Sequence, residues 1–192
     1  MTEYDLSAAA ATMAHLIRNI SDDQLAGPTP CPDYSLGDLV DHVGGFAMAF
    51  TWAANKESPP AGAQGPSGDA SRLTGDWRDR ISADLAELAA AWKQPEAWTG
   101  MTQAGGVDLP GEIAGVVALD ELVIHGWDVA RATGQPYDVD SQSLGAVEDF
   151  VQGFSPDGTP GMFGARVPVP DAAPRLARVI GMAGRDPNWS PN

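Results

Sequence analysis

Cysteine is almost absent from this sequence, in which Cys31 is the only one among 192 residues. The chain can therefore form no internal disulfide, which excludes the disulfide framework that stabilises many small secreted proteins. The first residues, MTEYDL, are acidic where a secretory signal peptide carries positive charge. Together these features predict a soluble protein of the reducing cytoplasm.

Basic residues are also scarce. The chain has 11 lysines and arginines against 26 aspartates and glutamates, giving a formal net charge of -15 and a pI near 4.2. A surface of this sign repels nucleic-acid phosphates and anionic membranes, so we expect neither as a partner. Long apolar runs are missing too. The longest weakly polar stretch, residues 36 to 54, is interrupted by Asp38, Asp41 and His42, so it does not qualify as a membrane span.

The apolar residues that are present recur with helical spacing in four segments. The predicted helices cover residues 4 to 25, 35 to 55, 72 to 93 and 112 to 133. Residues 56 to 71, between the second and the third, are rich in Pro, Gly, Ala and Ser and form a longer connection than a helical hairpin needs. We therefore predict a mainly all-α four-helix bundle in which this loop crosses between non-adjacent ends.

The residues that follow the fourth helix lack this regularity. They predict a short helix at 141 to 152, a loop at 153 to 164, a strand-like or extended segment at 165 to 173 and a last helix at 172 to 183. We expect the bundle to occupy residues 1 to 140. Residues 141 to 192 should pack on it as a C-terminal extension, because they are too few and too rich in loops for an independent domain.

The fourth predicted helix contains the most informative polar pair. It follows a predicted loop at residues 96 to 111 and is apolar on nearly every side, so it should lie at the centre of the bundle. Glu121 and His125 are four residues apart in it, which places them on one face about one turn from each other. Burying a carboxylate beside an imidazole is costly unless something pairs them, and a divalent cation can pair both.

His42 is the candidate third ligand. It shares the apolar side of the second predicted helix with Phe46, so it should face inward. Two imidazoles and a carboxylate from neighbouring helices can bind a metal and leave an open position, as in catalytic zinc sites. Zinc is the first choice, and Fe, Ni and Co suit the same ligands. From spacing alone, a buried ion pair or a helix-surface pair between Glu121 and His125 explains the pattern slightly better.

Other polar residues are weaker candidates. His15 on the first predicted helix is a second-tier ligand, for which a structural role is the preferred interpretation. Cys31 has no histidine beside it in the sequence and is expected to be a buried packing thiol. Arg175, Arg178 and Arg185 could meet a substrate carboxylate, but a solvated helix face is the preferred interpretation.

Three separated segments carry a resemblance to a known family, namely TPCPDYSLGDLVDHVGG, LDELVIHGWDVARATG and FGARVPVPD through GRDPNW. In this order they resemble the metal-binding family related to mycothiol-dependent maleylpyruvate isomerases, within the wider DinB-like four-helix proteins. The resemblance covers nearly the whole chain. It implies that a histidine of the second helix and a glutamate and histidine of the fourth bind the metal, and these fall on His42, Glu121 and His125.

The resemblance also implies a function. In related enzymes the metal holds the thiol of mycothiol as a thiolate, which attacks an electrophilic carbon of a small-molecule substrate. A cation can do this because it stabilises the anionic sulfur at neutral pH. We therefore predict a metal- and thiol-dependent isomerase or S-transferase.

Other functions and the oligomeric state stay open. A non-catalytic metal-binding protein of the same fold, with a binding or regulatory role, is the main alternative. An Fe(II) oxygenase using the same three residues is less favoured, because such sites usually occur on a barrel-shaped fold. The sequence does not decide between a monomer and a homodimer.

Overall fold

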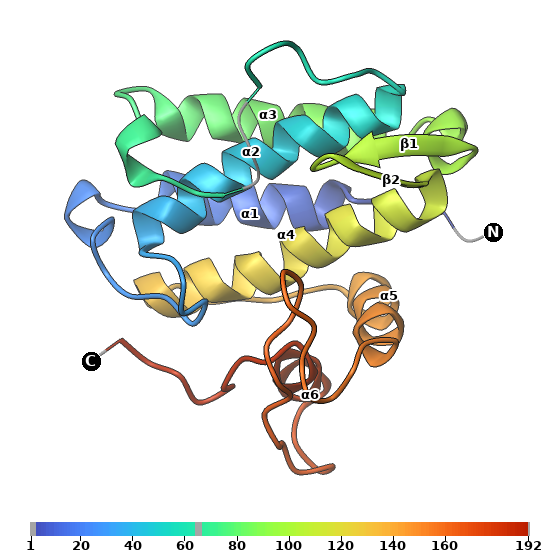
Figure 1. The fold of residues 1–192 in the computed structure, drawn as a ribbon. Helices are drawn as coiled ribbons and strands as arrows, with labels where there is room; N and C mark the ends of the chain where they lie inside the picture. The colour runs from blue at the N-terminus through green and yellow to red at the C-terminus, as the bar shows by residue number, and fades with distance from the viewer. Residues whose placement is uncertain (1–2, 64–66, 192) are drawn as a thin grey trace.

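Four long helices form a bundle in the computed structural model of the protein, which describes residues 3–63 and 67–191 (Figure 1). In chain order the elements are α1 (Ser7–Arg18), η1 (Asp22–Gln24), α2 (Leu36–Asn55), η2 (Ala70–Arg72), α3 (Trp77–Ala91), η3 (Pro95–Trp98), β1 (Met101–Ala104), β2 (Val107–Pro110), α4 (Gly111–Thr133), α5 (Ser141–Gln152) and α6 (Arg175–Met182), where η marks a short 3-10 helix. α1 and α2 each pack against both α3 and α4. The predicted helical bundle is confirmed.

Local hydrogen bonds decide where the helices begin and end. Ser35 caps α2, because its Oγ accepts a hydrogen bond from Asp38 N at 3.2 Å while the Asp38 carboxylate accepts one from Ser35 N at 3.1 Å. The predicted first helix is too long, since Ser21 and Gln24 cap a separate turn, η1, after α1 has ended. Among the helices that the structure describes, none combines the length and apolar character that crossing a membrane requires.

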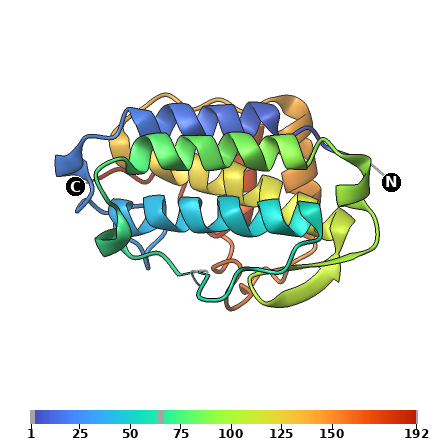
Figure 2. The ribbon, with the colours of Figure 1, turned by 90° about the horizontal axis from the view of Figure 1, so that it is seen from above.

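The segment between α2 and α3 carries the chain back along the bundle (Figure 2). It leaves the C-terminal end of α2, and its far end is held at the N-terminal end of the same helix. There Asp69 N donates a hydrogen bond to Asp41 Oδ2 at 3.0 Å. Ala70 N donates one to Asp38 Oδ1 at 2.8 Å. The predicted crossover is confirmed, although residues 64–66 of the predicted loop lie outside the described residues.

The loop predicted at residues 96 to 111 is wrong in part. Its beginning belongs to η3, and β1 and β2 pair as an antiparallel hairpin with Met101 opposite Pro110. Gly105 and Gly106 form the two-residue turn, with φ angles of 57° and 82°. Such a turn needs positive φ at both positions, which glycine adopts without strain. The Gly-Gly pair was therefore the feature of the sequence that could have predicted a hairpin. The two strands have only four residues each, which is too short to show a clear alternation of apolar and polar residues.

The C-terminal extension lies against α4 on the side away from α3 (Figure 1). α5 packs on α4, and α6 packs on α5. The rings of Phe150, Phe154 and Phe163 meet edge to face, with centroids 4.9 to 6.2 Å apart. Residues 165 to 170 have no regular secondary structure, a turn follows at 171 to 173, and the segment forms no ladder among the described residues, so the strand-like alternative is wrong there. A domain boundary at residue 140 stays a prediction.

Candidate metal centre and adjoining cavity

α4 carries two of the predicted ligands through the middle of the protein. It packs against α1, α2 and α5, and its Leu119 and Leu122 are at most 1% exposed. Glu121 and His125 lie one turn apart, with Glu121 Oε2 3.2 Å from His125 Nε2. The Glu121 side chain is 26% exposed and that of His125 is 11% exposed. The pair is therefore largely buried but open on one side.

His42 approaches the same carboxylate oxygen from α2. Its Nε2 lies 3.3 Å from Glu121 Oε2, and its side chain is 12% exposed. The ring packs against those of Tyr34 and Phe46, with centroids 5.4 and 5.6 Å away. It also lies nearly perpendicular to the ring of His125, at a centroid distance of 5.1 Å. The fold thus brings together all three predicted ligands, although His42 and Glu121 are 79 positions apart in the sequence.

The separations of these atoms fit a bound metal ion. The two imidazole nitrogens and the carboxylate oxygen lie within 4.8 Å of one another. Tetrahedral bonds of about 2.0 to 2.2 Å hold neighbouring ligand atoms about 3.3 to 3.6 Å apart. Contacts of 3.2 and 3.3 Å are close to that spacing, and they are long for charge-assisted hydrogen bonds, which are about 2.7 to 2.9 Å. The donor atoms are therefore spaced as a bound divalent cation would require.

Asp128, which the sequence interpretation missed, lies behind His125 on α4. Its Oδ2 accepts a hydrogen bond from His125 Nδ1 at 2.9 Å and one from Arg185 Nη2 at 3.2 Å. In a neutral ring this leaves the lone pair of Nε2 directed toward Glu121, which is the tautomer that a metal requires. An aspartate three residues after a candidate ligand on the same helix was the signal that could have identified it.

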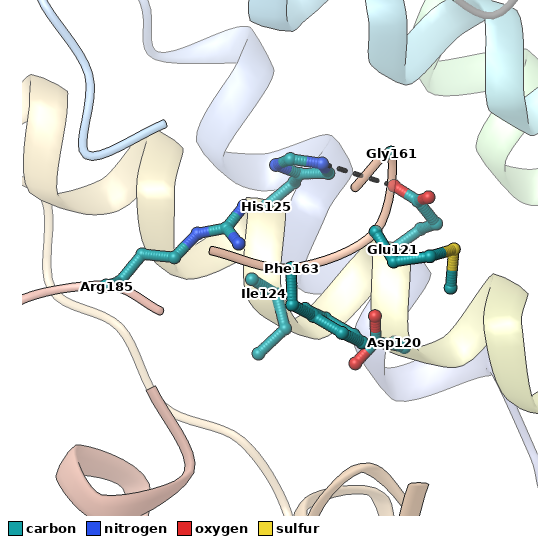
Figure 3. Close-up of a pocket in the computed structure, with 8 residues that line it drawn as sticks. Asp120, Glu121, Ile124, His125, Gly161, Phe163 and Arg185 are labelled. Atoms are coloured by element: carbon teal, nitrogen blue, oxygen red, sulfur yellow. Dashed lines mark ion pairs between the residues drawn. The ribbon is translucent and has the colours of Figure 1, made fainter. Parts of the chain in front are cut away.

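Arg185 corrects the interpretation of the C-terminal arginines. It is 8% exposed, so the expected solvated face is wrong for this residue. Figure 3 shows its guanidinium group reaching toward His125 from the C-terminal segment. It borders a small space of about 40 Å³ that Glu121, His125 and Phe163 also line. Arg185 therefore neutralises the buried charge of Asp128 instead of facing solvent.

The close contacts within the site shift the pKa values of its ionisable groups. Burial by itself lowers the pKa of His125, but hydrogen bonds with Asp128 and Glu121 outweigh it and raise this pKa to about 9. Burial raises the pKa of Glu121, but contacts with His125 and His42 outweigh that and hold it well below its usual value. Asp120 shifts the other way, because burial and the neighbouring Glu121 charge raise its pKa. A cation binding here would displace the His125 proton, since only the neutral ring is a ligand.

The remaining candidates lie away from these three ligands. His15 is exposed on α1, with Nε2 3.3 Å from the side-chain nitrogen of Asn19. Arg175 Nε donates a hydrogen bond to Glu148 Oε2 at 2.6 Å on the surface of the extension. Arg178 donates to backbone carbonyl groups just before α6. These residues therefore have structural partners of their own.

Cys31 lies on the other side of His125 and is half-buried. Its Sγ, a His125 nitrogen and an Asp128 oxygen are within 4.8 Å of one another, which makes a second group of potential ligands. Burial raises the pKa of the Cys31 thiol to about 11, so the thiol is protonated at neutral pH. His125 and Asp128 already hydrogen-bond each other in this group. We therefore keep the packing role for Cys31.

Cys31→Ser is accordingly expected to leave the metal content and the affinity for thiol unchanged, because the serine retains the size of a side chain that supplies no ligand. Elemental analysis and isothermal titration of the variant beside the wild type measure both quantities. Loss of metal in this variant alone would transfer the ligand role to Cys31.

A cavity of about 660 Å³ opens beside His42 and Glu121. Its walls come from α2, from the segment that follows α2, from the hairpin, from α4 and from the C-terminal extension. Trp52 of α2, Val107 of the hairpin and Met162 of the extension are examples. Nothing in the sequence indicated that the hairpin and the extension would meet the bundle here. The candidate metal centre therefore lies at the wall of a space large enough for a small organic molecule.

Comparisons with known proteins agree with the helical fold. A family model described as the mycothiol maleylpyruvate isomerase N-terminal domain matches residues 6–130. Uncharacterized proteins from two strains of Mycobacterium tuberculosis are each 34% identical over 139 residues, which cover 70% of this chain and 68% of theirs. Crystal structures of a mycothiol-dependent maleylpyruvate isomerase and of a mutant of it share the fold, with TM-scores of 0.58 and 0.57 at 17% identity. These matches cover 76% of this chain and 65% of each of those chains.

Proposed function

The chain belongs to the family of the mycothiol maleylpyruvate isomerase N-terminal domain, and we propose that it is a cytoplasmic metal-dependent enzyme that uses a low-molecular-weight thiol on a small electrophile. Mycothiol is the proposed thiol and zinc the proposed metal, held by His42, Glu121 and His125. One observation carries this proposal: the three ligand atoms converge at the wall of a cavity. A structural zinc site would be closed by a fourth protein ligand, whereas a catalytic one keeps an open position.

A divalent metal in this position would lower the pKa of a coordinated thiol and so make its sulfur nucleophilic at neutral pH. His42 and His125 would each hold the metal through the lone pair of a neutral ring, so Glu121 would contribute the only negative charge among the ligands and a net positive charge would remain to attract an anionic sulfur. Asp128 keeps the proton of His125 on Nδ1, and Tyr34 packs against the ring of His42.

The proposed reaction is addition of the thiol to a polarised double bond. A bond forms between the sulfur and the electrophilic carbon, the π electrons move to the neighbouring atom, and the thiol proton ends there. The former double bond can then rotate. Elimination of the thiol gives an isomerase, and release of the adduct gives an S-transferase.

Calorimetric titration of mycothiol into zinc-loaded protein tests the proposal. We expect saturable binding to the zinc-loaded form and none to the metal-free form, because the metal is the group that would hold the sulfur. Protein purified without an affinity tag should also contain the metal on elemental analysis. Absence of heat and of competition at millimolar thiol would remove the thiol-dependent reaction and leave the non-catalytic metal-binding protein as the better account.

Glu121→Gln is expected to weaken metal binding by at least the roughly 10- to 100-fold typical of changes around a metal ligand, because it removes the only anionic ligand. The bundle should keep its helical circular dichroism, since the amide has nearly the size of the carboxylate. Competition with a chelator of known affinity measures the metal constant. Unchanged metal affinity together with a large fall in melting temperature would make Glu121 a structural ion-pair partner instead.

A further inference from the structure

The cavity beside the metal centre has an apolar approach along α4. Ile113, Val117 and Glu121 follow one another at intervals of four residues, and all three line the cavity. This spacing puts them on one face of the helix. A ligand whose reactive carbon is near Glu121 therefore extends over Val117 and Ile113, so its remaining part contacts apolar side chains.

The other walls have the same character. The large apolar side chains that α2 and the C-terminal extension contribute are Phe46, Phe50, Trp52, Phe150, Phe154 and Met162. Several apolar groups around the cavity are also unusually exposed, with Val107 at 62% and both Ile113 and Met162 at 43%. Exposed apolar surface of this extent around a cavity is typical of a binding site whose ligand covers it.

Apart from the proposed metal, which the thiol would occupy, the cavity has no cationic side chain among its described residues to bind an anion. Among the described residues that line it there is no lysine or arginine, and its ionisable side chains are His42 and Glu121. Lys56, at the end of α2, instead donates a hydrogen bond to the Ala97 carbonyl at 2.8 Å. A substrate carboxylate that entered the cavity would lose water and gain no cationic side chain of the protein in return, which is costly.

We infer that the electrophile is an uncharged molecule with a bulky apolar part, such as an aryl or branched alkyl enone, and that it is not an organic acid. This assignment rests on the proposed function only in naming the occupant as the electrophile. The sulfur of the thiol bonds to the β-carbon of the enone, the π electrons shift toward the carbonyl group, and the thiol proton ends on the α-carbon. Atoms and electrons balance without an oxidant or a reductant.

Two unreactive ketones test the preference of the cavity without any thiol chemistry. Propiophenone and 4-propionylbenzoate share the ring and the ketone and differ by one carboxylate. Protein-observed NMR titration of the protein as purified should show propiophenone binding at least about tenfold more tightly, because burying an unpaired carboxylate costs more than that ratio requires. Equal or tighter binding of the carboxylate, or no binding of propiophenone, would overturn the inference.

Paired variants locate the binding. Ala49 lines the cavity, so Ala49→Trp should fill it and abolish propiophenone binding, whereas Ala83→Trp on the exposed side of α3 should not. Ile113→Arg adds a cation about 12 Å along α4 from Glu121 and should reverse the preference toward 4-propionylbenzoate. Ile113→Gln is its uncharged control. Unaltered binding in Ala49→Trp, or an unaltered preference in Ile113→Arg, would place the ketone elsewhere and contradict the inference.

Turnover separates this inference from the proposed function. Phenyl vinyl ketone and its 4-carboxyphenyl analogue also react with mycothiol without a catalyst, so that rate is measured and subtracted, and the zinc-loaded protein should accelerate the first with at least about tenfold higher kcat/KM. If neither ketone is accelerated although propiophenone binds, the proposed function fails and the cavity preference stands. If both are accelerated equally, the function stands and the preference fails.

Discussion

His42→Ala is expected to abolish binding of both the metal and the thiol. Of the three proposed ligands, His42 alone comes from α2, and its Nε2 lies 3.3 Å from Glu121 Oε2. Two ligands on one helix cannot enclose a cation on three sides, so the metal affinity should fall by far more than the roughly 10- to 100-fold seen for changes outside the ligand shell. Elemental analysis and mycothiol calorimetry on the purified variant measure both losses.

His15→Ala is the matched control for this experiment. It makes the same chemical change at an exposed position on α1, and it should leave metal and thiol binding at wild-type levels. Circular dichroism distinguishes ligand loss from unfolding in the His42 variant. Full retention of metal in His42→Ala would contradict the assignment and direct attention to the group of Cys31, His125 and Asp128.

Asp128→Ala is expected to cost about 3 to 5 kcal/mol of unfolding free energy, because it leaves the cation of Arg185 buried without its ion-pair partner. Asp128 is 0% exposed and Arg185 is 8% exposed, so little solvent can compensate. The same change removes the acceptor for His125 Nδ1 and should reduce metal affinity by roughly 10- to 100-fold. Urea unfolding of the metal-free variant measures the first effect, and chelator competition measures the second.

A second substitution separates these two roles of Asp128. Replacing a buried ion pair by apolar side chains is often neutral for stability. Asp128→Ala combined with Arg185→Met should therefore recover much of the lost stability, while the metal affinity stays low because His125 still lacks its acceptor. Recovery of both quantities in the double variant would show that Asp128 acts only as the counter-ion of Arg185 and does not orient His125.

The sequence allowed the helices and the ligand pair of α4 to be predicted, because both follow from local geometry. Apolar residues at helical spacing identify a buried helix wherever it packs. Residues four apart on such a helix share a face whatever surrounds them, so Glu121 and His125 were identified together. His42 needed more than this. Its inward direction followed from its own helix, but its approach to Glu121 was assigned only through the resemblance to a family.

Burial in the extension was harder to predict than helix position. Arg185 lies just after α6 in a segment of mixed composition, and an arginine there is more often exposed than buried. Its burial depends on Asp128, which is 57 positions away and belongs to α4. No pattern within either segment indicates that the two will meet.

By itself, then, the sequence determined an acidic chain of four main helices with a crossover and a potential carboxylate and imidazole pair on its central helix. Those properties depend on composition and on contacts within a turn or two of helix. The tertiary structure alone decided the cavity, because its walls come from α2, the segment after it, the hairpin, α4 and the extension. Each of these segments has an apolar side that would suit many partners, and the closest joint packing of all of them selects which sides enclose the site.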